Sequence, residues 1–333
     1  MKLPNRHRVI LGMDSVSVEP QKALLPKVVC VVGPTSAGKT CLGIQLAKHF
    51  HGEVVNADAR QVYRGFEIGT GKPAGVRETS SRGRDVLMVE DVPHHLMNMA
   101  DPDHVMTVGE WREQAMVAIQ DISAHDRLPI LVGGTGLYIQ AIVDNYHIPE
   151  VPPQPAFREE MDERSLEDLV RRLREIDPAA CEIVDLKNKR RVMRALEVVH
   201  VTGRSFASQR LLGEPLVDAL LIAPTCTKDV LNANISATID DMIQRGWVEE
   251  VKRLHDQGVD WEDPAMTSIG YRELGAYLRE EMPLEDAIEK IKQATRQYAK
   301  RQLTWFNKDK RIHWVKDGGE AQSLVSGWLD CKE

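Results

Sequence analysis

The stretch VVCVVGPTSAGKT, residues 28–40, constrains the fold more than any other part of the chain. Its apolar run, typical of a buried parallel strand, leads straight into a glycine-rich loop that ends in Lys39 and Thr40. Residues 33–40 fit the pattern G-x-x-x-x-G-K-[ST], and residues 39–50 continue as a predicted helix. A strand, this loop and a helix in that order predict a P-loop that binds phosphate.

The residue types in the loop suit this chemistry. Glycines let backbone N–H groups face phosphate oxygens, and the N-terminus of the helix adds the positive end of its dipole. Lys39 supplies a positive charge, and the hydroxyl of Thr40 suits Mg²⁺. The residues expected to bind the phosphates are Gly33, Pro34, Thr35, Ser36, Ala37, Gly38, Lys39 and Thr40.

Strands and helices alternate through the first half of the chain. Thr107 and Glu110 fit a capping box at the start of a helix over residues 107–125, and its apolar residues make one stripe. Further strands are predicted at residues 53–57 and 128–134, with a weaker one at 86–92. This alternation predicts a parallel sheet covered by helices on both faces.

The pattern changes near residue 149. The proline-rich segment PEVPPQP reads as a linker, and charged helical sequence follows over residues 156–204. Strands return at 219–224 and 311–315, on either side of a charged helical stretch over 228–307. We therefore expect an α/β fold of the P-loop NTPase type, with a parallel sheet flanked by helices, a helical insertion and a helical C-terminal region. Its expected parts are an irregular leader over 1–26, a core over 27–150 and 205–333, and the insertion over 151–204.

Composition narrows the setting. No run of about 18 apolar residues predicts a membrane span, and polar residues interrupt any apolar region of the leader, so we expect no secretory signal. The five cysteines are scattered without a CxxC pair, which is typical of a cytoplasmic protein. The net charge of −7 disfavours binding to nucleic acid, but it describes only the average over the whole surface. Two basic patches, at residues 187–195 and 292–311, run against it.

Asp58 is the carboxylate of most interest. It follows the predicted strand at 53–57, and ligands of parallel sheets bind beyond the carboxyl ends of the strands. There it could hold a metal or accept a proton from a nucleophile, or merely cap a turn. The strand at 128–134 ends in glycines and Thr135 rather than the acid of a typical ATPase, although Glu90 and Asp91 follow a weaker strand. Hydrolysis of a nucleoside triphosphate is therefore not the default interpretation.

Several blocks then resemble one family. GPTSAGKT, ADARQVYRGFEIGTGKP, VPHHL, LPILVGGTGLYIQAI, RRVMRALEV and YAKRQLTWF are similar, in order, to motifs of tRNA dimethylallyltransferases across residues 28–315. The early blocks are shared with adenylate isopentenyltransferases, whereas the later ones favour the tRNA enzymes. The resemblance implies transfer of a dimethylallyl group from dimethylallyl diphosphate to N6 of adenosine 37, beside the anticodon loop, with diphosphate leaving from the P-loop.

The resemblance also implies roles for residues. Asp58 takes the proton of the adenine amine, Thr35 lies near the reacting carbon, and Mg²⁺ binds near Thr40. Residues implied to contact tRNA are Asp58, Ala59, Arg60, Gln61, Thr135, Arg158, Arg190, Arg191, Val192, Met193 and Arg194. We expect a monomer.

The chain departs from the family pattern at several positions. Ala59 stands where serine is usual, Gly71 where alanine is common and Arg190 where glutamine is common. Asn234 and Thr238 stand where the family commonly has arginines, and the second is expected near the diphosphate. Alternative interpretations are a catalytically weakened tRNA-binding homologue, an enzyme acting on free AMP, ADP or ATP, and a small-molecule kinase.

Two aromatic residues and two histidines have simpler interpretations. Trp305 and Phe306, within the second basic patch, are predicted to be core residues rather than platforms for base stacking. His94 and His95 lack further ligands at metal spacing, which favours local hydrogen bonds over a metal site.

Overall fold

The computed structural model describes residues 25–80, 83–146, 149, 151–209 and 213–331. Within these residues, eight strands form one sheet in the spatial order β3-β4-β5-β2-β6-β1-β7-β8, and all neighbours from β5 to β8 are parallel. The strands are β1 (Lys27–Val31), β2 (Gly52–Asn56), β3 (Val76–Thr79), β4 (Asp85–Val89), β5 (Val92–His95), β6 (Leu128–Val132), β7 (Asp218–Pro224) and β8 (His313–Val315). The leader lies outside the described residues except for its last two.

Helices fall into three groups. The sheet is flanked by α1 (Lys39–His49), α2 (Val108–Ser123), α3 (Gly136–Val143) and α13 (Gly318–Asp330). The segment predicted as an insertion holds α4 (Pro155–Asp162), α5 (Leu166–Ile176), α6 (Ala180–Ile183) and α7 (Lys189–Thr202), followed by α8 (Phe206–Gln209). The C-terminal group is α9 (Lys228–Gln244), α10 (Trp247–Asp256), α11 (Tyr271–Leu278) and α12 (Leu284–Phe306).

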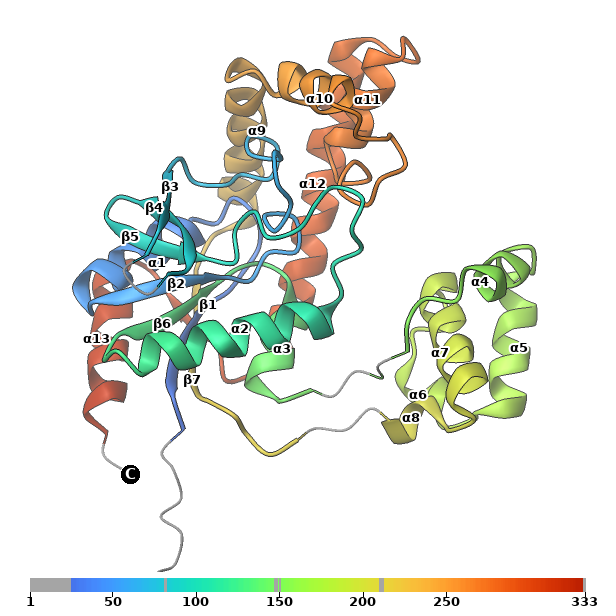
Figure 1. Ribbon diagram of the computed structural model, residues 1–333, viewed down its shortest axis with the longest axis horizontal. Coiled ribbons are helices and arrows are strands. Elements are labelled where there is room, and N and C mark those ends of the chain that lie inside the picture. Colours follow the sequence, from blue (N-terminus) through green and yellow to red (C-terminus); the bar gives the residue numbers. More distant parts are fainter. Residues whose placement is uncertain (1–24, 81–82, 147–148, 150, 210–212, 332–333) are drawn as a thin grey trace, which may run out of the picture.

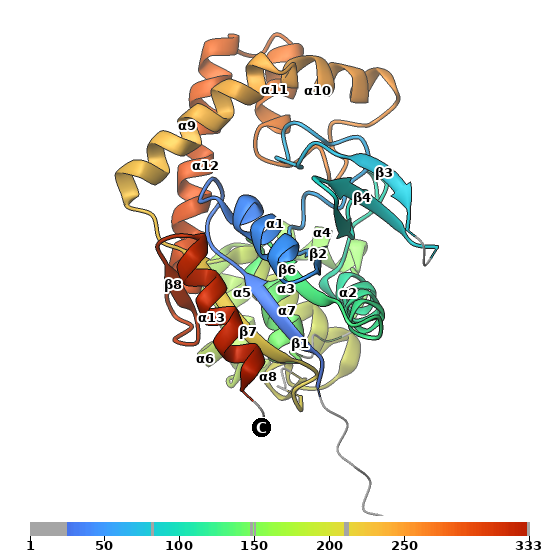
Figure 2. The same ribbon diagram turned by 90° about the vertical axis from the view of Figure 1, so that its left-hand side faces the viewer.

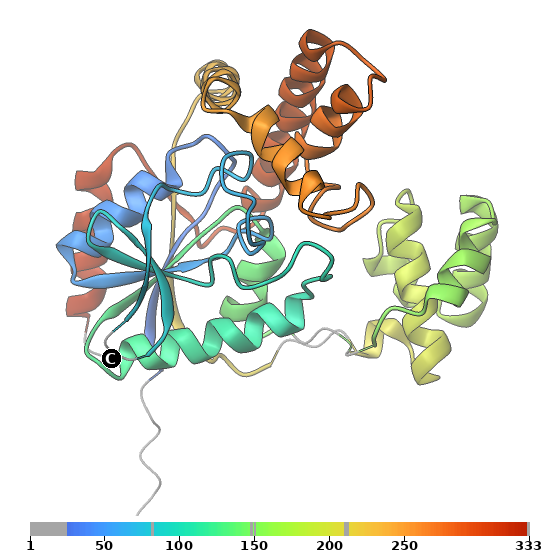
Figure 3. The same cartoon turned by 45° about the horizontal axis from the view of Figure 1, so that its top comes forward.

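Alternation along the strands divides the core into two layers. Val28 and Cys30 of β1 pack in the cluster that includes residues of α2 and α3. Val29 and Val31 pack in the cluster of α1 and α13. Both faces of the central strands are therefore buried, as expected for a parallel sheet. Figure 3 shows α1 and α13 on one side of the sheet and α2 on the other. These findings confirm the predicted fold class.

The strand predicted at residues 86–92 is wrong in detail. It is a hairpin, with β4 antiparallel to both β3 and β5. Glu90 and Asp91 form its turn with φ values of 49° and 65°, and the two-residue turns that match strand twist need such positive angles. The sheet is therefore mixed at this edge.

The capping box predicted at the start of α2 is confirmed. The Thr107 side chain accepts from the Glu110 backbone N–H, and the Glu110 carboxylate accepts from the Thr107 N–H. Both orphan donors at the first turn are thereby satisfied.

The helices α4–α7, with α8, have their own small core. Met161, Leu169, Leu173 and Leu196 are buried in it. Figure 1 shows these helices set apart from the sheet. On the core side, the Asn145 side-chain amide donates to the Glu214 carbonyl at 2.8 Å, so the chain leaves the core and returns to it at neighbouring points.

The C-terminal helices stand over one edge of the sheet, with α9 and α12 rising from it to α10 and α11 (Figure 2). The buried carboxylate of Glu250 in α10 fixes them to the loop that follows β2. It accepts from the N–H groups of Glu67 at 3.1 Å, Ile68 at 2.9 Å and Gly69 at 3.3 Å, and from the Tyr271 hydroxyl at 2.6 Å. This contact holds that loop under the helices. No helix among the described residues is long and apolar enough to cross a membrane.

Candidate active site

The loop between β1 and α1 has the conformation that its glycines allow. Gly33 has φ 131° and Gly38, at the N-cap of α1, has φ 88°. Residues with a Cβ rarely adopt such angles, so the glycines are required by the backbone itself. The loop thus ends at the N-terminus of α1, where an anion is favoured.

Lys39 folds back over the loop. Its Nζ donates to the Pro34 carbonyl at 2.6 Å. Burial lowers the pKa of Lys39 to about 8, although the negative charge of Asp58 opposes that shift. The ammonium group is therefore mostly charged at pH 7 and loses its proton at mildly basic pH.

Asp58 begins the loop after β2 and uses one carboxylate oxygen to fix the turn. Its Oδ1 accepts from the Arg60 N–H at 2.9 Å, and its own N–H donates to Asn56 Oδ1 at 3.0 Å. The Asn56 amide is itself bonded to the Leu96 carbonyl at 3.1 Å. The turn-capping interpretation of Asp58 therefore holds for one oxygen, and it leaves the carboxylate half-buried beside the loop.

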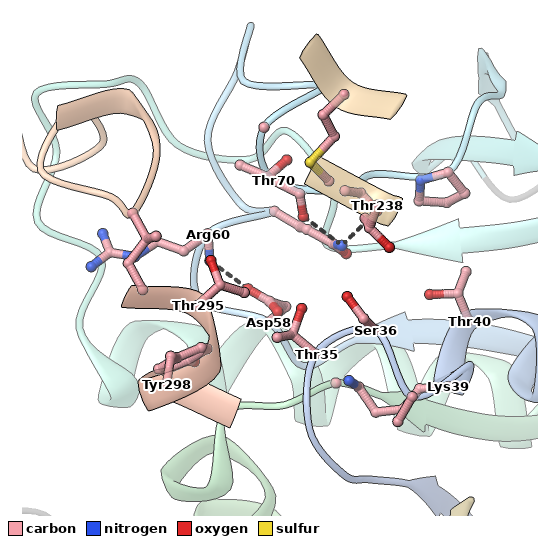
Figure 4. A pocket seen from close by; sticks show the side chains of 18 of the residues that line it. Thr35, Ser36, Lys39, Thr40, Asp58, Arg60, Thr70, Thr238, Thr295 and Tyr298 are labelled. Carbon is pink, nitrogen blue, oxygen red and sulfur yellow. Dashed lines mark hydrogen bonds between the residues drawn. The ribbon is translucent and has the colours of Figure 1, made fainter. Parts of the chain in front are cut away.

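One cavity of about 950 Å³ joins the two features. Residues 35–40 of the P-loop line one side of it, and Asp58 lines it as well. Figure 4 shows Asp58, Thr35, Ser36, Lys39 and Thr40 around this space. The P-loop and Asp58 therefore border one shared crevice.

The neighbouring tRNA-contact candidates also border the cavity. Ala59, Arg60, Gln61 and Thr135 all line it. The Thr135 hydroxyl accepts from the Ala59 N–H at 3.0 Å, which links the loops that follow β6 and β2. The Gln61 amide donates to the carbonyls of Thr70 and Gly71, each at 3.2 Å.

The candidates of the helical insertion lie elsewhere. Among the described residues, none between 151 and 204 lines the cavity. Arg190 and Arg191 are exposed at the start of α7, and Met193 is half-buried. The expected contact of the Val192 side chain with tRNA is corrected, because Val192 is 0% exposed in the core of the insertion and its side chain is not available to a ligand.

Arg158 and Arg194 are already bonded within the insertion. Both donate to Glu197, whose side chain is 0% exposed: Arg158 Nε at 2.8 Å and Arg194 Nη1 at 2.6 Å. Burial alone would raise the pKa of Glu197, but hydrogen bonds from Arg158, the Gln154 N–H and Arg194 outweigh it and lower the pKa to about 2. These two arginines therefore stabilise the packing of the insertion and also contribute positive charge to its surface.

Asn234 and Thr238 do lie at the phosphate side of the cavity. Both line it, and the Asn234 amide donates to the Ser36 carbonyl at 3.3 Å. Figure 4 shows Thr238 above Ser36 and Thr40. The two positions where the family has arginines thus face the P-loop with neutral side chains.

The other acids and the histidines do not build a metal site. Glu90 pairs with Lys48 at 2.8 Å, and neither Glu90 nor Asp91 lines the cavity. His94 Nδ1 lies 2.9 Å from the Val92 carbonyl, and His95 Nε2 lies 2.7 Å from Glu53 Oε2, which confirms local bonding for both. The described residues contain no group of three His, Cys, Asp or Glu side chains that could hold a metal.

Helix α12 contributes cavity residues that the sequence analysis placed in the second basic patch without assigning them to this site. Thr295, Tyr298 and Arg301 line the cavity, and burial raises the pKa of Tyr298 to about 12. Gln302 is buried beside them. The sequence signal for Gln302 was a polar glutamine on the same helix face as the buried Ala299 and Phe306.

The second basic patch is partly neutralised by its own contacts. Lys292 pairs with Asp240 at 2.8 Å, and Arg311 pairs with Asp144 and Asp309, each at 2.6 Å. Phe306 is buried as predicted, but Trp305 is 39% exposed, which corrects its assignment to the core. Its indole instead lies against Gly136, where a Cβ would come within 2.2 Å of Nε1.

The parallel sheet, the P-loop and the acid across the cavity are together typical of P-loop enzymes that act on a phosphorylated substrate. Residues 61–309, more than half of the chain, match the family model described as IPP transferase, and residues 26–91 match one described as isopentenyl transferase. The chain belongs to the IPP transferase family.

Similar proteins agree with this placement. The chain is 39% identical to the tRNA dimethylallyltransferase of Anoxybacillus flavithermus. The matched 290 residues cover 86% of this chain and 89% of the relative. It is 37% identical over 312 residues to that of a Roseiflexus species, spanning 91% and 99%.

Two solved structures share the fold. A full-length tRNA isopentenylpyrophosphate transferase from Bacillus halodurans matches with a TM-score of 0.67 at 33% identity, covering 92% of this chain and 97% of that one. A eukaryotic dimethylallyltransferase acting on tRNA matches with a TM-score of 0.70 at 27% identity, covering 91% and 77%.

Proposed function

We propose that this protein transfers a dimethylallyl group from dimethylallyl diphosphate to N6 of adenosine 37 in tRNA and releases diphosphate. The observation that carries the proposal is the single cavity bordered by both the P-loop and Asp58. A donor gripped at one side and an amine held at the other would meet across it. The names of the similar proteins favour tRNA over free AMP as the acceptor.

The chemistry divides between the two sides. On the loop side, backbone N–H groups, the N-terminus of α1 and Lys39 stabilise the negative charge that grows on the leaving oxygen. On the opposite side, Asp58 accepts the proton from N6. The allylic carbon–oxygen bond breaks, the carbon–nitrogen bond forms, diphosphate leaves with the bonding electrons and the proton passes to the carboxylate.

The donor set of the cavity fits Mg²⁺. The oxygen ligands at the loop are hydroxyls, with Thr40 and Ser36 lining the cavity, and hard oxygen donors suit this ion. Because Mg²⁺ usually takes several ligands from water and substrate phosphates, the hydroxyl of Thr40 would be one protein ligand among them. When bound, the ion would share the charge of the diphosphate.

The RNA has to present its base to this cavity. Adenosine 37 would leave the stack of the anticodon loop and enter beside Asp58, Ala59, Arg60, Gln61 and Thr135, because N6 cannot otherwise reach the donor. Arg190 and Arg191 are exposed at the start of α7 and would contact the RNA backbone. We propose that one monomer performs the reaction.

A catalytically weakened tRNA-binding homologue is the second candidate. The neutral Asn234 and Thr238 at the phosphate side favour it, because a missing cation reduces stabilisation of the leaving group. Such a protein would bind the anticodon loop and form no product.

Incubation of the purified protein with labelled dimethylallyl diphosphate and Mg²⁺ separates these candidates. In parallel reactions, the acceptor is a tRNA transcript, the same transcript with guanosine at position 37, or AMP. Mass spectrometry of the nucleosides should find N6-prenyladenosine in the first reaction alone. RNA binding without product would favour the weakened homologue, and label on AMP would overturn tRNA as the acceptor.

A further inference from the structure

Gln302 of α12 is a buried amide with both ends bonded. The residue is 5% exposed. Its Oε1 accepts from the Thr35 N–H at 2.9 Å, and its Nε2 donates to the Gly134 carbonyl at 2.9 Å. One partner is a donor and the other an acceptor, so together they define which end of the amide faces which loop.

The two partners belong to different loops of the proposed site. Thr35 lies in the P-loop after β1, and Gly134 lies in the loop after β6. The next residue, Thr135, bonds the loop after β2 through the Ala59 N–H, adjacent to Asp58. Gln302 therefore bonds two of the loops directly, and the third is linked to them through Thr135.

The local sequence permits this close approach. A Cβ on Gly134 would come within 2.2 Å of Gln302 Nε2, so any larger residue there would displace the amide. The length of glutamine also matters, because two bonds of 2.9 Å must be made at once to partners on separate loops.

We propose that Gln302 is a positioning residue for prenyl transfer, which holds Thr35 and the Asp58 loop at the separation that the reaction requires. The inference rests on the proposed function. The inference also extends the proposed function. Because the N–H of Thr35 donates to Gln302, the backbone N–H groups that bind phosphate would come from later residues of the P-loop. A bonded amide also fixes geometry without adding negative charge beside a diphosphate.

Loss of the amide should act on the chemical step. Gln302→Met keeps the length and most of the volume of the side chain but removes both hydrogen bonds. Misplacement of reacting groups by about 1 Å costs on the order of 100-fold in rate, so we expect kcat to fall by about 10-fold to 100-fold. The KM for tRNA should change less than about twofold, because RNA-binding residues are untouched.

A double-mutant cycle with Thr35 distinguishes positioning from general support. The cycle compares wild type, Gln302→Met, Thr35→Ala and the double variant, with Gln297→Met, at an exposed position of the same helix, as control. If Gln302 positions the Thr35 side chain as well as the Asp58 loop, its substitution should cost at least about tenfold in kcat with Thr35 present and at least about threefold less in the Thr35→Ala background, where only the effect on the Asp58 loop remains. Equal losses in both backgrounds, or no loss in either, would overturn the proposal.

Two further arms keep the test decisive. Gln302→Asn is measured in the same cycle. It retains a polar amide on a shorter side chain, so it replaces the methionine variant if that variant does not fold. Binding of inorganic pyrophosphate, measured without RNA, should weaken by about threefold or more in Gln302→Met and remain unchanged in Gln297→Met. Unchanged pyrophosphate affinity would contradict the role of Gln302. A wild-type protein that binds pyrophosphate but prenylates no RNA would instead overturn the proposed function.

Discussion

In both the core and the insertion a buried polar side chain bonds several segments together, but the two side chains differ in charge. In the core, the neutral amide of Gln302 joins the loops around the cavity. In the insertion, the carboxylate of Glu197 joins Arg158, Arg194 and the Gln154 N–H, away from the cavity. Arg194 also donates to the linker carbonyl of Val151 at 2.8 Å.

The difference matches what each region is proposed to bind. A carboxylate in the place of the Gln302 amide, bonded to the P-loop itself, would add a second negative charge beside a diphosphate, whereas the amide holds the loop without that charge. In the insertion, a buried carboxylate fixes two arginines firmly, although it takes up charge that would otherwise face RNA. Chemistry and RNA binding should therefore be separable by mutation.

The largest separation should come from Asp58→Ala. Removing the proton acceptor should lower kcat by about 10²-fold to 10⁴-fold, the usual contribution of general base catalysis. The Kd for tRNA should stay within about threefold, because most of the proposed RNA contacts remain. Single-turnover transfer and filter binding measure the two quantities. Full turnover in this variant would exclude Asp58 as the base.

The converse separation should come from Glu197→Leu in the insertion. Breaking a buried ion pair by removal of one partner costs about 3–5 kcal/mol, so the insertion should loosen and the Kd for tRNA should rise by about tenfold. At saturating RNA, kcat should remain within about twofold. Glu159→Gln, an exposed acid of α4, is the matched control. A fall in kcat with unchanged Kd would break the division between the regions.

The same carboxylate predicts that the insertion responds to acid. The folded pKa of Glu197, about 2, lies below the ordinary value of 4.5. Its stabilising effect is therefore complete above about pH 4.5 and is lost as the pH falls toward 2. Proteolysis of the linker by an acid-active protease should accelerate over this range, and Glu197→Leu should remove most of the dependence on pH.

Lys39 predicts a response to base on the core side. The folded pKa of about 8 lies below the ordinary 10.5, so the unliganded lysine loses its charge as the pH rises through 8. Affinity for pyrophosphate should be complete below pH 8 and then decline by up to about tenfold per pH unit. Titration calorimetry from pH 6.5 to 9.5 measures it. Lys39→Arg should abolish the decline, and an identical decline in that variant would exclude Lys39 as its source.

The smallest expected effect is a gain. Thr238→Arg returns a cation to the phosphate side of the cavity, where Thr238 lies only partly buried. Since charges with access to water contribute modestly, we expect about a threefold tighter Kd for pyrophosphate. Thr238→Gln, long but neutral, is the control. Weaker binding in the arginine variant alone would show that this site rejects a cation.

Much of the core could be predicted because its signals are local. The P-loop pattern specifies its strand, turn and helix within thirteen residues, and Asp58 follows directly from a strand end. The hairpin at 85–95 was missed since its turn uses Glu90 and Asp91, without the glycine or asparagine that usually marks positive φ.

The contacts between distant segments could not be read from the sequence. Gln302 lies 267 residues from Thr35, and nothing local to either residue indicates their bond. The resemblance implies that Arg158 and Arg194 contact tRNA, but their bonds to the buried Glu197 depend on how α4 and α7 pack. Val192 is buried although the resemblance implies contact with tRNA, and Trp305 is exposed although it is predicted to be a core residue, because both outcomes depend on how the helices pack.

A crystal structure with an anticodon stem-loop and the unreactive thio-analogue of dimethylallyl diphosphate tests the shared cavity most directly. We expect the diphosphate against residues 35–40 and the flipped adenine opposite, with N6 about 3 Å from an Asp58 oxygen, the distance that proton transfer requires. An adenine bound outside this cavity, or an Asp58 carboxylate turned away from N6 in the complex, would contradict it.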